Sequence, residues 1–108
     1  MDFQIDFLFK TGAGYDDLVN LIQGNPRYVF EILKQDKIDK RTKKSRESGW
    51  VQIGHKQHAG YIKLTKDNGV CRAAVHDDSG GLKLIGAWTS WMASNASHLI
   101  SGLDLRIL

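Results

Sequence analysis

Residues 49–85 read GWVQIGHKQHAGYIKLTKDNGVCRAAVHDDSGGLKLI, and this stretch decides the fold. Apolar and polar residues alternate along it, and turn signals at 57–60, 67–69 and 77–81 divide it into short segments. Alternation with a period of two is typical of antiparallel strands that bury one face. The stretch therefore predicts an antiparallel meander.

The dipeptide Asn68-Gly69 predicts a hairpin with a defined register. Both residues tolerate the positive φ of a type I′ turn, and a two-residue loop fixes which residues face each other. The expected pairs are Asp67 with Val70, Thr65 with Arg72, Leu64 with Ala73, Lys63 with Ala74, Ile62 with Val75 and Tyr61 with His76. Core-facing positions are then Ile62, Leu64, Ala73 and Val75, with Val51 and Ile53 of the preceding strand. Outward positions are Tyr61, Lys63, Thr65, Arg72 and His76, with Trp50, Gln52 and Lys56.

The flanking segments predict further strands and helices. Alternation over 3–9 and over 103–107 predicts a strand at each end of the chain. Helical spacing of apolar residues over 15–22 predicts a helix that ends at Gly24. A longer apolar stripe runs from Trp88 to Ile100 and predicts a second helix, with Gly102 just beyond its end.

Residues 27–36 fit either a helix or a strand. Tyr28, Phe30 and Ile32 alternate as in a strand. We expect a helix, because Asn25-Pro26 has the form of an N-cap followed by proline in the first turn.

These elements predict one α+β domain over residues 1–108. A mostly antiparallel sheet of the N-terminal strand, the meander and the C-terminal strand should have two or three helices on one face. The leading core candidates are Phe3, Phe7, Ile53, Leu64, Trp88, Trp91 and Leu99.

The net charge of +3 has an uneven distribution. Residues 34–46 hold seven basic and two acidic side chains, so the rest of the chain is slightly acidic. We call 34–48 the basic segment and expect a polar loop or helix end there. Clustered lysine and arginine neutralise phosphates, so this segment favours a polyanionic partner.

The basic segment and the outward sheet face together form the candidate contact surface. Aromatic rings on an open sheet face can stack bases. The predicted binding residues are Trp50, Tyr61, Lys63 and Arg72 from the sheet and Lys40, Arg41, Lys43, Lys44 and Arg46 from the segment. We expect a small soluble, non-enzymatic binding protein whose partner is a nucleic acid, an acidic protein or a second copy of the chain.

The histidines suggest an alternative function. His55, His58 and His76 include an i, i+3 pair and a third residue on a nearby strand. Such a set could supply an acid–base pair for a metal-independent ribonuclease. No cysteine or glutamate completes a zinc set beside them, so we expect no metal and no cofactor.

Three smaller features have modest interpretations. The glycine-rich segment 11–14 is expected to be a strand–helix connector, since it lacks the rest of a phosphate-binding motif.

Cys71 is the only cysteine, which excludes an internal disulfide and favours a cytoplasmic, membrane-free protein. Serines at helical spacing suggest a homodimer seam on the last helix: Ser90, Ser94, Ser97 and Ser101.

Overall fold

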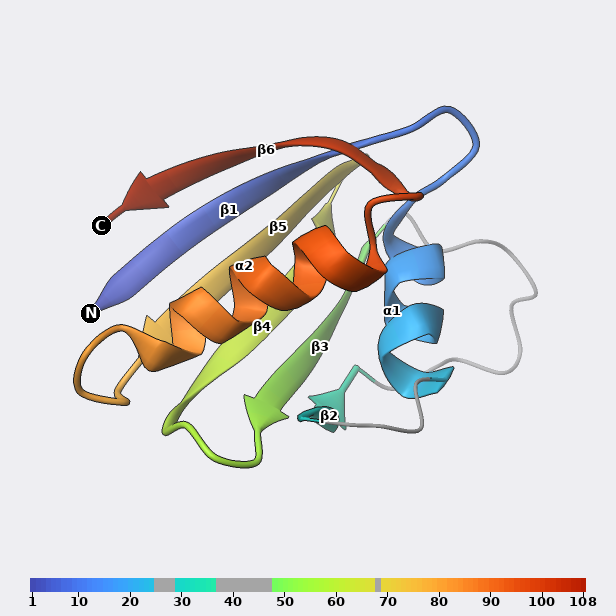
Figure 1. The fold of residues 1–108 in the computed structure, drawn as a ribbon. Helices are drawn as coiled ribbons and strands as arrows, with labels where there is room; N and C mark the ends of the chain where they lie inside the picture. The colour runs from blue at the N-terminus through green and yellow to red at the C-terminus, as the bar shows by residue number, and fades with distance from the viewer. Residues whose placement is uncertain (25–28, 37–47, 68) are drawn as a thin grey trace.

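The computed structural model describes residues 1–24, 29–36, 48–67 and 69–108. These residues form two helices and one sheet of six strands (Figure 1). The elements are β1 (Asp2–Phe9), α1 (Tyr15–Gly24), β2 (Phe30–Gln35), β3 (Ser48–His55), β4 (Gly60–Asp67), β5 (Val70–Asp77), α2 (Lys83–Asn95) and β6 (Ile100–Ile107). The chain is therefore a compact α+β domain with an antiparallel sheet, as the alternating pattern predicts.

The strand order is β2-β3-β4-β5-β1-β6, and every neighbouring pair is antiparallel. The first and last strands of the chain lie side by side, and the Leu108 amide donates to the Asp2 carbonyl over 2.9 Å. Figure 1 shows residue 1 and residue 108 at the same end of the sheet. The meander strands β3, β4 and β5 thus form the middle of the sheet, and β1 lies between β5 and the edge strand β6.

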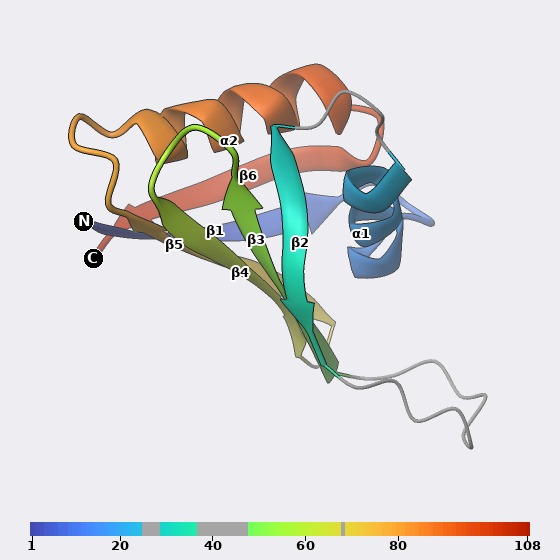
Figure 2. The same cartoon turned by 90° about the horizontal axis from the view of Figure 1, so that it is seen from below.

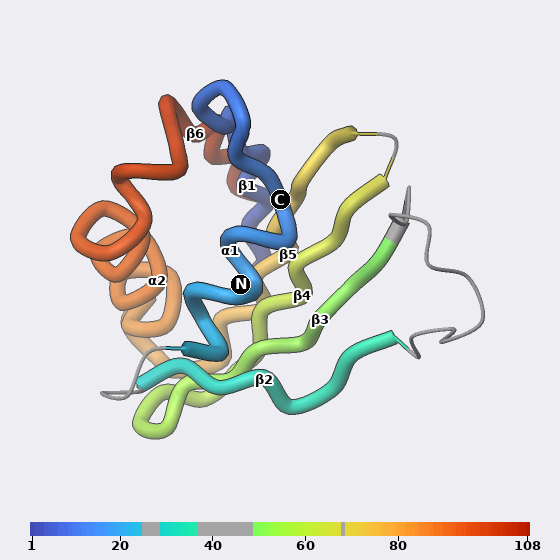
Figure 3. Tube along the Cα trace, turned by 90° about the vertical axis from the view of Figure 1, so that its right-hand side faces the viewer, coloured from blue at the N-terminus to red at the C-terminus, as the bar shows by residue number. Residues whose placement is uncertain are grey.

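The sheet has an inner face, on which the core lies, and an outer face. Both helices lie on the concave, inner side of the strongly twisted sheet (Figures 2 and 3). Alternate residues of β1, β3, β4 and β5 meet the helices and are buried. The largest fully buried side chains are Trp88, Phe30, Ile5, Leu18, Ile22, Ile53, Ile62, Leu64, Leu84 and Val75.

The predicted hairpin register is confirmed at every pair from Tyr61↔His76 to Asp67↔Val70. Ile62, Leu64, Ala73 and Val75 are at most 1% exposed, so the predicted inward positions are also confirmed. A type I′ dipeptide needs no distant contact to set its register, which is why the sequence sufficed here. Five of the seven leading core candidates are buried, while Trp91 and Leu99 are half-buried.

The expectation of a helix within 27–36 is wrong, because Phe30–Gln35 form the edge strand β2. Phe30 pairs with His55 and Ile32 with Ile53, and the Phe30 side chain is 1% exposed. Pairing with β3 and burial of an aromatic ring outweigh a local cap preference, which is worth only about 1 kcal/mol. The expected cap, Asn25-Pro26, lies outside the described residues.

The last helix ends earlier in the chain than the apolar stripe predicts. α2 stops at Asn95, and Ile100 already belongs to β6. The predicted serine seam is therefore wrong as a helix face: Ser90 and Ser94 lie in α2, Ser97 in the following turn and Ser101 in β6. Pairing of 100–107 with β1 requires the chain to leave the helix early.

α2 begins at Lys83, ahead of the apolar stripe that starts at Trp88, because two side chains satisfy its first amides. Ser79 Oγ accepts from the Lys83 and Leu84 amides, and buried Asp77 accepts through Oδ2 from the Ile85 amide at 2.9 Å. Unpaired amides of a first helical turn are costly to bury, so this cap sets where α2 starts. The sequence alone suggested only a turn at these residues.

Gly60 opens β4 in a conformation that a side chain would strain. Its φ is +121°, and a Cβ there would come within 2.1 Å of the His76 carbonyl oxygen. Glycine at this position therefore allows the β3–β4 loop to lie close to β5, where the Asp78 amide donates to the Ala59 carbonyl. In the part of the chain that the structure describes, no helix is long and apolar enough to cross a membrane.

Candidate functional site

The outer face brings the predicted sheet residues onto one surface. Trp50 faces Thr65, Gln52 faces Lys63, and Tyr61 faces His76, all on the side of the sheet opposite to the core. Arg72 lies beside Thr65 on the same face. Of the basic segment, Lys34 lies in β2, whereas the predicted binding residues Lys40, Arg41, Lys43, Lys44 and Arg46 fall outside the described residues.

Trp50 and Lys63 form a contact between a cation and an aromatic ring. The Lys63 Nζ lies 5.0 Å from the centroid of the Trp50 ring, within the range of a cation–π interaction. The Asp36 amide donates to the Trp50 carbonyl over 3.1 Å. Asp36, in the described part of the basic segment, therefore lies directly beside Trp50 in the sheet.

An open pocket of about 550 Å³ surrounds this contact. Its lining is Asp36, Gly49, Trp50, Lys63, Thr65, Lys66 and Asp67. Two lysines and two aspartates leave the pocket itself nearly neutral.

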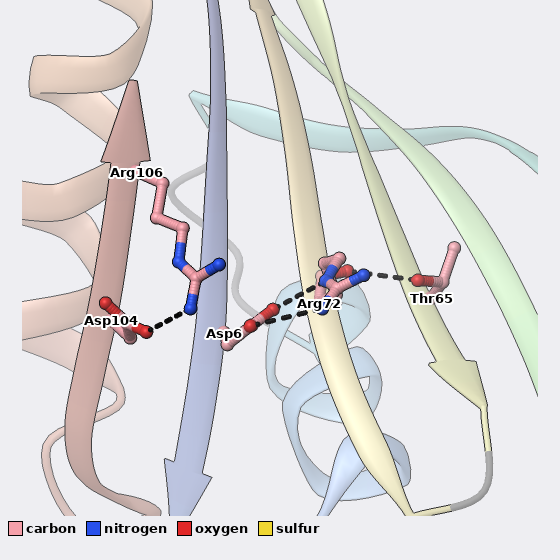
Figure 4. Close-up of polar contacts among 5 residues, drawn as sticks. All are labelled: Asp6, Thr65, Arg72, Asp104 and Arg106. Atoms are coloured by element: carbon pink, nitrogen blue, oxygen red, sulfur yellow. Dashed lines mark hydrogen bonds and ion pairs between the residues drawn. The ribbon is translucent and has the colours of Figure 1, made fainter. Parts of the chain in front are cut away.

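Arg72 is engaged by a carboxylate on the neighbouring strand. Its Nε donates to Asp6 Oδ1 at 2.6 Å and its Nη2 to Asp6 Oδ2 at 3.2 Å, a fork geometry shown in Figure 4. The hydrogen bond and charge of Arg72 hold the pKa of Asp6 below its usual value, against the opposing effect of partial burial. Arg72 is thus a structural cation of the sheet, and its charge is less available to a partner than the sequence suggested.

A second charged pair continues this row to the sheet edge. Asp104 lies opposite Asp6 on β6, and Arg106 donates to Asp104 through Nη2 at 3.3 Å (Figure 4). Arg106 also helps to lower the pKa of Asp6. Two aspartates face each other here, and the two arginines offset their repulsion.

His76 lies in a polar group at the far end of the outer face. Its Nδ1 is 2.7 Å from Asp2 Oδ1, and its ring centroid is 5.2 Å from that of Tyr61. A shallow pocket of about 200 Å³ adjoins these three side chains. An aspartate in contact with a histidine orients its ring, which is one half of an acid–base arrangement.

The other two candidate histidines lie apart from His76. His55 and His58 stack with ring centroids 4.4 Å apart, and His55 also contacts the buried ring of Phe30 at 4.9 Å. His55 Nδ1 accepts from the Gln57 amide, while burial and the nearby His58 lower the pKa of His55. Because His55 faces the core side and His76 the outer side, the sheet separates the proposed acid–base partners.

The glycine-rich loop lies beside a pocket of about 700 Å³. The Gly14 amide donates to Asp17 Oδ2 at 2.9 Å, so the helix beginning at Tyr15 already has a carboxylate at its N-terminus. This arrangement disfavours an anion there. Burial raises the pKa of the Cys71 thiol in the same pocket to about 12, which keeps Cys71 protonated and a poor nucleophile.

Two features of the outer face were absent from the sequence interpretation. The Asp6–Arg72 and Asp2–His76 contacts both join β1 to β5, which lie more than sixty residues apart in the chain. Alternating Asp2, Gln4 and Asp6 showed a polar strand face, but no local pattern named its partner. Across the described residues, no three His, Cys, Asp or Glu side chains gather in a way that could hold a metal ion.

Comparison of the whole chain with protein-family models, with curated proteins and with solved structures finds no match to any of them.

Proposed function

We propose that this chain is a non-enzymatic binding protein that holds a single-stranded nucleic acid at the corner of the outer face formed by Trp50 and Lys63. The contact between Lys63 Nζ and the Trp50 ring, next to the start of the basic segment, carries this proposal. A ring on which a base can stack and a cation that can meet a phosphate are the two elements that such sites combine.

The distribution of charge supports the same corner. Asp2, Asp6 and Asp104 lie on the β1–β6 half of the outer face, and Arg72 and Arg106 face them. The β2–β4 half carries Lys34 and Lys63, and the chain that connects β2 to β3 contains six more basic residues. A polyanion would therefore be steered toward β2–β4 and away from β1 and β6.

Salt dependence of binding tests the electrostatic half of the proposal. Affinity for a fluorescent single-stranded oligonucleotide should fall steeply with salt. In the triple variant Lys43→Gln, Lys44→Gln and Arg46→Gln, the slope of log K against log salt should decrease by about 0.7 for each cation lost. Lys83→Gln removes one exposed charge from the inner, helix-bearing side and should leave the affinity nearly unchanged.

Trp50→Ala tests the stacking half. Loss of one base–ring stack should weaken binding by about 1–3 kcal/mol at constant salt slope. Weak binding that responds neither to salt nor to Trp50→Ala would overturn the proposal. Tight binding to polyglutamate with none to oligonucleotides would replace the nucleic acid with an acidic protein.

A small ribonuclease is the second candidate, and the contact between His76 and Asp2 favours it. His76 would act as the acid–base group and Tyr61 as a neighbouring base-stacking ring. In this case His76→Ala should abolish RNA cleavage, whereas His58→Ala should not. A wild-type protein that leaves RNA intact, with and without divalent metal, dismisses this function.

A further inference from the structure

The outer edge of β6 is a long, open strand edge. β6 is the last strand of the sheet, and no described strand pairs with its far side (Figure 1). Unprotected edges of this length invite another strand to add to the sheet. We propose that β6 pairs with β6 of a second copy of this chain, in an antiparallel dimer with a twofold axis at Leu105.

The hydrogen-bonding direction of β6 determines which residues are available. The Leu108 amide donates to the Asp2 carbonyl, and the two residues fall in the same register as Arg106↔Gln4 and Asp104↔Asp6. Since bonding alternates along an antiparallel strand, Asp104 and Arg106 bond toward β1, and the backbone groups of Leu103, Leu105 and Ile107 point outward. These three residues would bond to the second copy.

Apolar side chains on the same residues support burial at this edge. Leu103, Leu105 and Ile107 are 44%, 50% and 66% exposed. Their partners in β1, Phe7, Ile5 and Phe3, are at most 6% exposed, so the apolar layer of the inner face continues to β6 without a cover. An added strand would shield this exposed apolar row.

Charge complementarity selects a copy of the same chain and one register. A twofold axis perpendicular to the sheet lies between the two β6 strands and places one residue opposite its own copy; we call this an axis through that residue. An axis through Asp104 places aspartate opposite aspartate, and one through Arg106 places arginine opposite arginine. An axis through Leu105 places each Asp104 opposite Arg106 of the other copy, which makes both cross-strand pairs attractive. The same axis pairs Leu103 with Ile107.

This geometry also closes the assembly. An isologous interface uses the same strand in both copies, so the assembly stops at a dimer. Pairing of β6 with the opposite edge β2 would instead continue into a filament. The inference does not depend on the proposed function, because Leu105 and Trp50 lie on opposite faces of the sheet and on different strands.

Sedimentation equilibrium of the full chain tests the dimer. We expect a wild-type dimer and a monomer for Leu105→Lys, with a native circular dichroism spectrum in both. Leu33→Lys changes an equally exposed leucine (52%) on the other edge strand, β2, and should leave the dimer intact. A monomeric wild type, a larger polymer or a dimer that survives Leu105→Lys would overturn the proposal.

Charge exchange tests the register. Asp104→Arg and Arg106→Asp each place like charges opposite each other and should weaken the dimer about tenfold or more. The double exchange restores opposite charges and should recover wild-type affinity. Asp104→Arg also faces Asp6 within the monomer, so it should not impair folding. Failure of the double exchange to recover affinity excludes the axis at Leu105.

Discussion

The two faces of one sheet give tryptophan two different environments. Trp88 of α2 is fully buried against the inner face, with ring contacts to Phe30 at 5.2 Å and Trp91 at 5.9 Å. Trp50 of β3 is only half-buried on the outer face, where Lys63 lies over its ring. The inner face should therefore determine stability, and the outer face should be able to change with little cost to folding.

The largest expected effect is at the inner face. Trp88→Ala should lower the free energy of unfolding by about 3–5 kcal/mol, because it leaves a cavity where helix and sheet meet. Trp50→Ala should cost a small fraction of that while it weakens binding. Denaturant titration of both variants measures the difference, and equal losses would contradict the distinction between the two faces.

Trp88→Phe refines this comparison. The Trp88 Nε1 is buried and finds no acceptor among the described residues, which costs free energy in the wild type. Phenylalanine removes that donor and still fills much of the space. We expect a clearly smaller loss of unfolding free energy than for Trp88→Ala. A loss as large as that of Trp88→Ala would show that the indole N–H is hydrogen-bonded in the wild type.

An intermediate effect is expected at the cap of α2. Asp77→Asn removes a carboxylate that is 5% exposed and accepts from Ser79 and the Ile85 amide, so it should cost about 1–3 kcal/mol. The matched control is Asp78→Asn, which changes the exposed neighbour and should cost almost nothing. Thermal melts of the two variants at neutral pH measure the contrast.

The same carboxylate predicts a pH dependence. Burial raises the pKa of Asp77, but its hydrogen bonds outweigh burial and hold the pKa below the ordinary value of 3.8. A lowered folded-state pKa means that its contribution is complete above pH 3.8 and is lost as the pH falls through the folded pKa. Asp77→Asn should therefore reduce the loss of stability at acid pH. If the acid part of the plot of stability against pH is unchanged, other groups cause that loss.

The smallest effect is expected on the outer face. Asp6→Asn and Arg72→Gln should each destabilise slightly, and a double-mutant cycle should show a favourable coupling that weakens with added salt. The geometry is bidentate, but the Arg72 side chain is 47% exposed, so water competes for it. A coupling as large as the effect of Asp77→Asn would mean that the outer face also determines stability.

Local signals in the sequence were sufficient for half of the fold. The dipeptide Asn68-Gly69 predicted the register that β4 and β5 have, and the alternation over 3–9 identified β1. β2 was mistaken for a helix because its evidence is non-local: Phe30 is buried by β3 and by Trp88 of α2, and neither is near it in the sequence.

The candidate site was likewise predicted only in part from the sequence. The sequence by itself determined which side chains of β4 and β5 face outward, because alternation and one tight turn specify parity. Only the tertiary structure decided that Arg72 meets Asp6, that His76 meets Asp2, and that the sheet separates His55 from His76. These outcomes depend on which strands are neighbours in the sheet. The strand order is set by burial of the whole core, so it cannot be predicted from any single stretch of the sequence.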